Sequence, residues 1–145
     1  MSPLHGRVAD VPDALVDRLA GIAPVQRAPA ALAEASRDWW PLAMIWADDG
    51  TAVTSPAAIV MPDSSAAVAE VARACHDARV PLTVVAGRSG VCGGSMPVHG
   101  GVLLDLTAVC GIVDVDDASL VRWLNRQYIQ HRRASKRSPE AEELV

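Results

Sequence analysis

A glycine-rich loop that directly follows an apolar, β-branched run is the feature that most constrains how this chain can fold. The run ends at Val84-Val85. Four of the eight residues 87–94 are then glycine, and three of these are spaced by three, at Gly87, Gly90 and Gly93. Glycine has no Cβ and tolerates positive φ, so successive backbone N–H groups can converge on an anion. The pattern is typical of a loop that holds a phosphate, although a tight connection between two strands would show the same local pattern.

The two common phosphate-binding motifs do not account for this loop. No lysine follows the glycines, as GxxxxGK[ST] requires, and the spacing of Gly87 and Gly90 does not fit GxGxxG. Both motifs also need a helix after the loop, so that the helix N-terminus meets the phosphate. The stretch Met96-Pro97-Val98-His99-Gly100-Gly101 opens no helix. Any phosphate would therefore be held by the loop itself, through the amides of Gly87 to Gly94.

The residues around the loop predict alternating strands and a helix. An apolar run at 57–61 predicts a buried strand, residues 65–79 an amphipathic helix that begins after cap residues, and Leu82–Val85 the next strand. Residues 101–106 and 111–116 predict two more strands. A strand, a helix and a strand in about 30 residues have the size of a βαβ unit, so the predicted fold class is α/β or α+β. The loop then leaves the carboxyl end of a strand, where ligands bind in open α/β sheets.

The two ends of the chain differ from this middle part. In residues 1–36, Val11, Leu15, Leu19 and Ile22 recur at helical spacing, and a second short helical piece at 30–35 follows. The pair Trp39-Trp40 beside a proline is interpreted as a packing corner.

The character of the chain changes again after residue 120. Residues 121–145 carry a net charge near +3 and residues 1–120 one near −7, and the stretch 121–128 is expected to begin a helix. We therefore expect an N-terminal helical segment (1–36), a partial domain (37–120) and a divergent basic tail (121–145).

Composition indicates a globular chain in a reducing compartment. Half of the residues are hydrophobic and phenylalanine is absent, so the core must be built from Ala, Val, Leu and Ile. Cys75, Cys92 and Cys110 are an odd number at unrelated spacings and are interpreted as reduced thiols. No apolar stretch has the length of a signal peptide or a membrane span, so we expect a cytoplasmic protein. No metal is expected, because the cysteines and histidines lack the paired spacing of a zinc site.

Residues 32–120 carry several motifs in a specific order. These are Ser36-Arg37-Asp38, the strand Ala58-Ile59-Val60-Met61-Pro62, Glu70-Val71 in the capped helix, Arg79-Val80-Pro81-Leu82-Thr83, and the segment from Ala86 to Pro97 followed by Gly100-Gly101-Val102-Leu103-Leu104-Asp105-Leu106. In this order they resemble the N-terminal part of the FAD-binding domain of FAD-linked oxidases, the PCMH-type or vanillyl-alcohol-oxidase superfamily. The most similar members are D-lactate and glycolate dehydrogenase-like proteins and alkyl-dihydroxyacetonephosphate synthases.

The resemblance implies FAD as the ligand and a set of residues that contact it. The loop would wrap the pyrophosphate with its amides, and the Ser89 hydroxyl, at a position where the family often has threonine, could bond a phosphate oxygen. Some relatives attach flavin through a loop histidine, but none lies between Gly87 and Gly94, and Cys92 is interpreted as a small loop residue, so non-covalent FAD is expected. The implied cofactor-binding residues are Gly87, Arg88, Ser89, Gly90, Val91, Cys92, Gly93 and Gly94, flanked by Pro62 and Leu106.

The chain also departs from the family. Family domains continue past the strand at 113–116 into a second subdomain and a substrate-binding cap, whereas here the pattern is lost from about Val121. We therefore expect a truncated N-terminal piece, in which no catalytic residue can be nominated because the catalytic groups of the family lie in the absent part.

Two functions from different classes stay open. The first is an FAD-dependent oxidoreductase, or part of one, related to 2-hydroxy-acid oxidases and dehydrogenases. The second is a non-catalytic nucleotide-binding module or inert fragment, which a separate chain could complete. A third hypothesis, nucleic-acid binding through Arg132-Arg133 and Lys136-Arg137, is disfavoured because the acidic body would repel nucleic acid.

Overall fold

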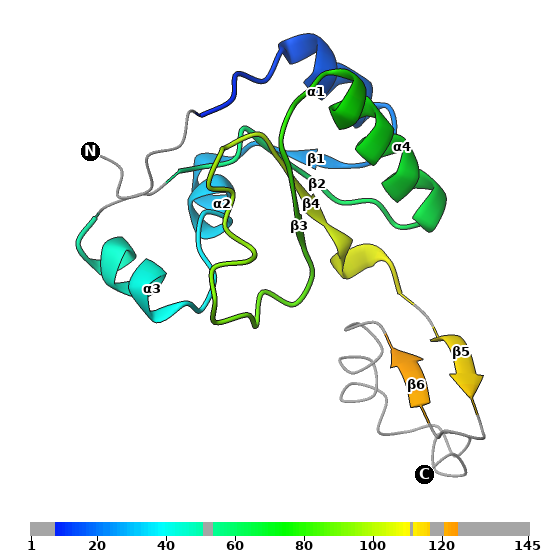
Figure 1. Ribbon diagram of the computed structural model, residues 1–145. Coiled ribbons are helices and arrows are strands. Elements are labelled where there is room, and N and C mark those ends of the chain that lie inside the picture. The colour runs from blue at the N-terminus through cyan, green and yellow to red at the C-terminus, as the bar shows by residue number, and fades with distance from the viewer. Residues whose placement is uncertain (1–7, 51–53, 111, 117–120, 125–145) are drawn as a thin grey trace.

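The computed structural model describes residues 8–50, 54–110, 112–116 and 121–124 (Figure 1). A four-stranded sheet forms the centre of the main body, in the order β1-β2-β4-β3. The strands are β1 (Val25–Gln26), β2 (Ala58–Val60), β4 (Val102–Asp105) and β3 (Leu82–Val85). β2, β4 and β3 run parallel and β1 runs antiparallel to β2. The predicted α/β class is confirmed, and β1 brings the N-terminal segment into the same sheet.

Helices cover both faces of this sheet (Figure 1). α1 (Asp13–Ala20) and α4 (Ser65–Asp77) pack on one face, where they meet Val60, Val102 and Leu104. α2 (Pro29–Glu34) packs on the other face, where the cluster around Ala35 includes the alternate residues Ile59, Leu103 and Val85. Successive strand residues point to opposite faces, so a strand buried on both sides is apolar throughout. This explains why β2 and β4 appear in the sequence as continuous apolar runs.

α4 forms where the sequence predicts a helix. The Ser64 side chain accepts a hydrogen bond from the Ala67 N–H at 3.3 Å, which satisfies one of the free donors at the helix start. The buried side chains are Val71, Ala74 and Cys75. The helix ends at Asp77, two residues before the predicted end, and Arg79 then takes the left-handed conformation, with φ 54°.

The strands β3 and β4 are parallel neighbours, yet no helix connects them. Residues 86–101 cross from the carboxyl end of β3 to the amino end of β4 as an irregular segment. Thr54 donates from Oγ1 to the Pro97 carbonyl at 2.8 Å, and the Ala57 N–H donates to the Gly101 carbonyl at 2.8 Å. Gly101 has φ +73°, and a Cβ there would collide with the Pro81 carbonyl. The absence of a helix after the loop, predicted from Met96-Pro97, is confirmed.

Besides β1, which was not predicted, two further elements differ from the sequence predictions. α3 (Pro41–Asp48) was not predicted, and it begins with a proline at its first position, where the missing N–H costs nothing. β6 (Val121–Leu124) is a strand, so the helix expected from residue 121 is wrong over these residues. It pairs antiparallel with β5 (Ile112–Asp116) in a two-stranded sheet, and this pairing outweighs the local helical pattern.

The described part of the chain contains no helix that is long and apolar enough to cross a membrane.

Candidate functional site

The three parallel strands end at one edge of the sheet, and residues nominated from the sequence follow each of them. Val60 and Val84 both align with Leu104 in register, so the segments that continue into Pro62, Gly87 and Leu106 lie at the same edge. Pro62, however, is fully buried, and Leu106, in a short 3₁₀ turn (Leu106–Ala108), packs against the α1 and α4 core. The topology therefore places all three nominated positions together, but the Pro62 side chain is buried and the Leu106 side chain is partly buried against the core.

The glycine loop, residues 87–94, has a different backbone from the one predicted. Among its glycines only Gly93 has a left-handed φ, +78°. The other left-handed residue of the loop is Arg88, with φ 48°. Ser89, Gly90, Val91 and Cys92 are exposed, so the middle of the loop is accessible to a ligand. Glycine here provides exposed backbone more than unusual dihedral angles.

Arg88 is held at the start of the loop by an ion pair. Its Nη2 lies 3.5 Å from Oδ2 of Asp105, the last residue of β4, and the two side chains are 25% and 13% exposed. Asp105 Oδ1 accepts a hydrogen bond from the Thr107 N–H at 2.9 Å. Asp105 was not nominated from the sequence. The sequence feature that could have identified it is an acidic residue at the end of a buried strand, in a chain whose glycine loop contains a single arginine.

A second contact comes from the tryptophan corner, Asp38-Trp39-Trp40. The Trp39 N–H donates to the Gly90 carbonyl at 3.1 Å, and the Trp40 ring packs so closely on Gly93 that a Cβ there would lie 2.9 Å from Cε3. Trp40 also stacks edge-on against Trp46, with ring centroids 5.6 Å apart. The expected packing corner is thus confirmed for Trp40, whereas Trp39 is 63% exposed.

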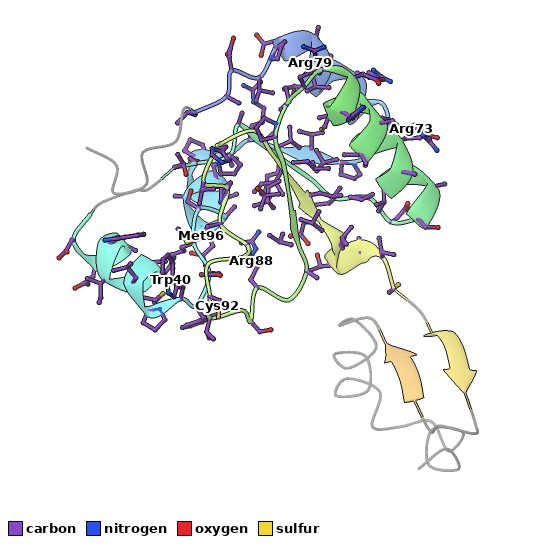
Figure 2. The ribbon with its side chains drawn as sticks, in the orientation of Figure 1. Trp40, Arg73, Arg79, Arg88, Cys92 and Met96 are labelled. Carbon is purple, nitrogen blue, oxygen red and sulfur yellow. The ribbon has the colours of Figure 1, made fainter. Side chains whose placement is uncertain are left out.

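Asp38 is the buried polar residue of this corner. It is 4% exposed, and its Oδ1 accepts a hydrogen bond from the Trp40 N–H at 2.9 Å. Its Oδ2 is buried and has no hydrogen-bond partner among the described residues. Figure 2 shows Trp40, Arg88, Cys92 and Met96 gathered where α3 meets the glycine loop, away from Arg73 and Arg79.

Two cavities lie beside α2 and α3, and the smaller one is also lined by a loop residue, Arg88. A cavity of about 540 Å³ lies between α2 and α3 and is also lined by Met96. A smaller one of about 50 Å³ is lined by Asp38, Trp39 and Arg88. Glu34, Arg37 and Met44 line both, and Arg37 donates to Glu34 at 2.9 Å. The larger cavity could not be predicted from the sequence, because α3, which forms one of its walls, was not predicted.

The remaining reactive side chains are the cysteine thiols and the residue types that can bind a metal. The three cysteines are unpaired, as expected; Cys92 and Cys110 are exposed and Cys75 is buried. Burial raises the pKa of the Cys75 thiol, and the nearby Arg18 charge lowers it in part. In the described ranges no three or more His, Cys, Asp or Glu side chains gather into a possible metal site. The basic residues 132, 133, 136 and 137 lie outside these ranges.

The comparisons with known proteins agree with this geometry. Residues 56–124 match the family described as FAD binding domain. Over 66 residues the chain is 32% identical to a D-lactate dehydrogenase of Anaerostipes hadrus, which covers 46% of this chain and 14% of that protein.

Solved structures extend the likeness of fold. An alkyldihydroxyacetonephosphate synthase superposes with a TM-score of 0.68 at 18% identity, over 83% of this chain and 23% of that one. A p-cresol methylhydroxylase with substrate bound superposes with a TM-score of 0.58 at 22% identity, over 72% of this chain and 20% of that one.

This chain therefore spans less than a quarter of the length of each of these three proteins. Its β2, α4, β3, glycine loop and β4 all lie inside the matched segment. Residues 56–124 are accordingly similar to the FAD binding domain family, and the chain shares its fold with part of the two superposed enzymes.

Proposed function

We propose that this chain binds FAD non-covalently and that the glycine loop holds its diphosphate. The observation that carries the proposal is the position of this loop. It begins at the edge where three parallel strands end, its middle residues are exposed, and it lies inside the segment that matches the FAD binding domain. Backbone amides grouped at such an edge suit a diphosphate better than they suit an uncharged ligand.

The nominated residues would contribute in different ways. Amides of Gly87 to Gly94 would meet the phosphate oxygens, and the exposed Ser89 hydroxyl could donate to one of them. The Arg88 guanidinium is already engaged by Asp105, so its first role would be to fix the start of the loop. Because the Pro62 side chain is buried, this residue would offer the ligand mainly backbone atoms, whereas Leu106 is partly buried and keeps some of its surface exposed.

The reaction is a further step of the same proposal. Bound FAD would supply the electron transfer, while the residues of this chain bind and orient it. The match to a D-lactate dehydrogenase favours a 2-hydroxy acid as the substrate of the complete system. No side chain of the site is nominated as catalytic. A chain that binds FAD but oxidises no 2-hydroxy acid would favour the alternative, a non-catalytic FAD-binding module.

Titration of the purified protein with FAD, followed by flavin fluorescence, tests the binding. Gly90 and Gly94 are the best positions to fill, because a Cβ at Gly90 makes only an ordinary contact at 3.8 Å and one at Gly94 meets nothing within 4 Å. We expect saturable binding by the wild type and a loss of about tenfold or more in the G90A/G94V variant, since carbons are added to the loop whose backbone would hold the phosphates.

The matched control is A66V, which adds bulk on exposed residue 66 of α4. It should bind FAD like the wild type. Equal FAD affinity in the wild type and G90A/G94V would contradict the role of the loop, and a wild type that does not bind FAD would contradict the proposal as a whole.

A further inference from the structure

Residue 38 is an aspartate, although a neutral side chain could accept the one hydrogen bond that the local backbone offers. Its Oδ1 accepts the Trp40 N–H, a role that Asn also fills at such a turn and Ser fills more weakly. The second oxygen, Oδ2, is buried without a hydrogen-bond partner among the described residues. A buried polar atom without a partner costs free energy, and more so when it is charged. The second oxygen therefore requires an explanation other than the turn.

This oxygen lies against the glycine loop. A Cβ built on Gly90 would be 3.8 Å from Oδ2, and the Trp39 N–H holds the Gly90 carbonyl from the same corner. Gly90 is the middle of the three evenly spaced glycines. Any anion bound by amides around Gly90 would therefore be close to the Asp38 carboxylate.

The nearby cations are already engaged elsewhere. Arg88 is the one basic residue in 87–94, and it pairs with Asp105. Arg37 lines the same small cavity as Asp38, and it pairs with Glu34 at 2.9 Å. No ion pair among the described residues includes Asp38. Asp38, Asp105 and Arg88 together leave one negative charge beside the loop.

We propose that Asp38 is a specificity-determining residue, whose charge makes the loop reject highly charged phosphate ligands in favour of a dinucleotide diphosphate. The inference rests on the proposed function of the loop. Coulomb repulsion grows in proportion to the charge of the ligand, and a buried charge is screened little by salt. The two bridging phosphates of FAD carry about two negative charges, whereas ATP and pyrophosphate carry about three to four. Asp38 would therefore oppose ATP and pyrophosphate about twice as strongly as FAD.

The discriminating variant is D38N, which keeps an oxygen for the Trp40 N–H and removes the charge. Isothermal titration calorimetry of the wild type and D38N with pyrophosphate, ATP and FAD gives the three affinities. We expect D38N to bind pyrophosphate and ATP about tenfold or more tightly than the wild type does, and FAD at most about threefold more tightly. An unchanged ratio of ATP affinity to FAD affinity would overturn the inference, because a general change in the loop would shift all ligands alike.

Two further variants keep the test decisive. E34Q removes a charge from the same cavity, but the Glu34 side chain is 65% exposed and is paired with Arg37. The ratio of ATP affinity to FAD affinity in E34Q should therefore equal that of the wild type. D38S also retains an acceptor for the Trp40 N–H and serves if D38N does not fold. If E34Q changed the ratio of ATP affinity to FAD affinity as much as D38N does, the specific role of Asp38 would be overturned.

Failure of the proposed function has a different signature. A wild type that does not bind FAD refutes the proposed function. The pyrophosphate and ATP titrations still decide the inference about charge in that case: a gain in D38N supports it, and no gain overturns it.

Discussion

The Arg88 guanidinium lies 3.5 Å from the Asp105 carboxylate, and this pair joins a left-handed loop residue to the end of the central strand β4. Arg88 has φ 48°, a conformation that costs a residue with a Cβ about 1–2 kcal/mol. The ion pair is partly buried, so it is screened less than a surface pair and can offset part of that cost. The start of the glycine loop is thus fixed by a side chain on a strained backbone.

Replacement of Arg88 separates the strain from the ion pair. R88A and R88G both remove the pair, but only glycine relieves the left-handed backbone, so R88G should be more stable than R88A by about 1 kcal/mol. Urea denaturation measures the difference. Arg79, with φ 54° in the turn after α4, is the matched control, and R79G should exceed R79A by a similar amount. If glycine were more stabilising than alanine at position 79 but not at position 88, the backbone strain inferred at Arg88 would be contradicted.

Removal of the Asp105 charge should loosen the loop without unfolding the strand. D105N keeps an oxygen for the Thr107 N–H but leaves Arg88 without its carboxylate partner. We expect faster tryptic cleavage after Arg88, because cleavage requires local opening and fewer contacts now oppose it. Limited proteolysis with mass spectrometry follows each cut separately. E34Q, which releases Arg37 in the same way, controls for a general change in charge; equal cleavage after Arg88 in D105N and the wild type would refute the anchoring role.

Gly93 and Gly94 are neighbours that should respond in opposite ways to the same substitution. Gly93 has φ +78° and a Cβ there would lie 2.9 Å from the Trp40 ring, whereas a Cβ at Gly94 meets nothing within 4 Å. G93A should therefore lose about 1–3 kcal/mol of stability, and G94A should stay within about 0.5 kcal/mol of the wild type. Thermal and urea unfolding check both values. Equal stability of G93A and G94A would show that Trp40 does not constrain the loop.

The strands β2, β3 and β4, the helix α4 and the glycine loop could be predicted because their signals are local. Apolar runs bounded by prolines, the cap at Ser64 and the spacing of Gly87, Gly90 and Gly93 all lie within short windows of sequence. α3 was not predicted, although Pro41 at its first position is a helix-start signal. β6 was missed because its partner β5, and not its own sequence, selects the strand.

The site shows the same division between local and tertiary information. The exposed loop residues could be nominated from spacing, but Asp38 and Asp105 could not, because their importance depends on burial and on partners far along the chain. Asp38 lies about fifty residues before Gly90, and the Trp39 to Gly90 hydrogen bond that joins them depends on how α2 and α3 are placed. For Pro62 and Leu106, the sequence indicated positions after the carboxyl ends of strands but not the direction of the side chains, since that depends on the packing of the core.

The thiols give a prediction about pH. Cys92 and Cys110 are exposed and should react quickly with a thiol reagent, while Cys75 should react only after unfolding. Burial raises the pKa of Cys75 above its ordinary value of 9.0, so the folded protein holds this proton more tightly than the unfolded chain does. The resulting stabilisation is fully present below pH 9.0 and is lost as the pH rises from there through the raised pKa of the folded state. Urea unfolding at a series of pH values should show a steeper alkaline loss of stability in the wild type than in C75A, with C92A, which removes an exposed thiol, as the control for loss of a cysteine. Parallel slopes in the wild type and C75A, or rapid reaction of all three thiols in the native protein, would contradict the burial of Cys75 between α4 and the sheet.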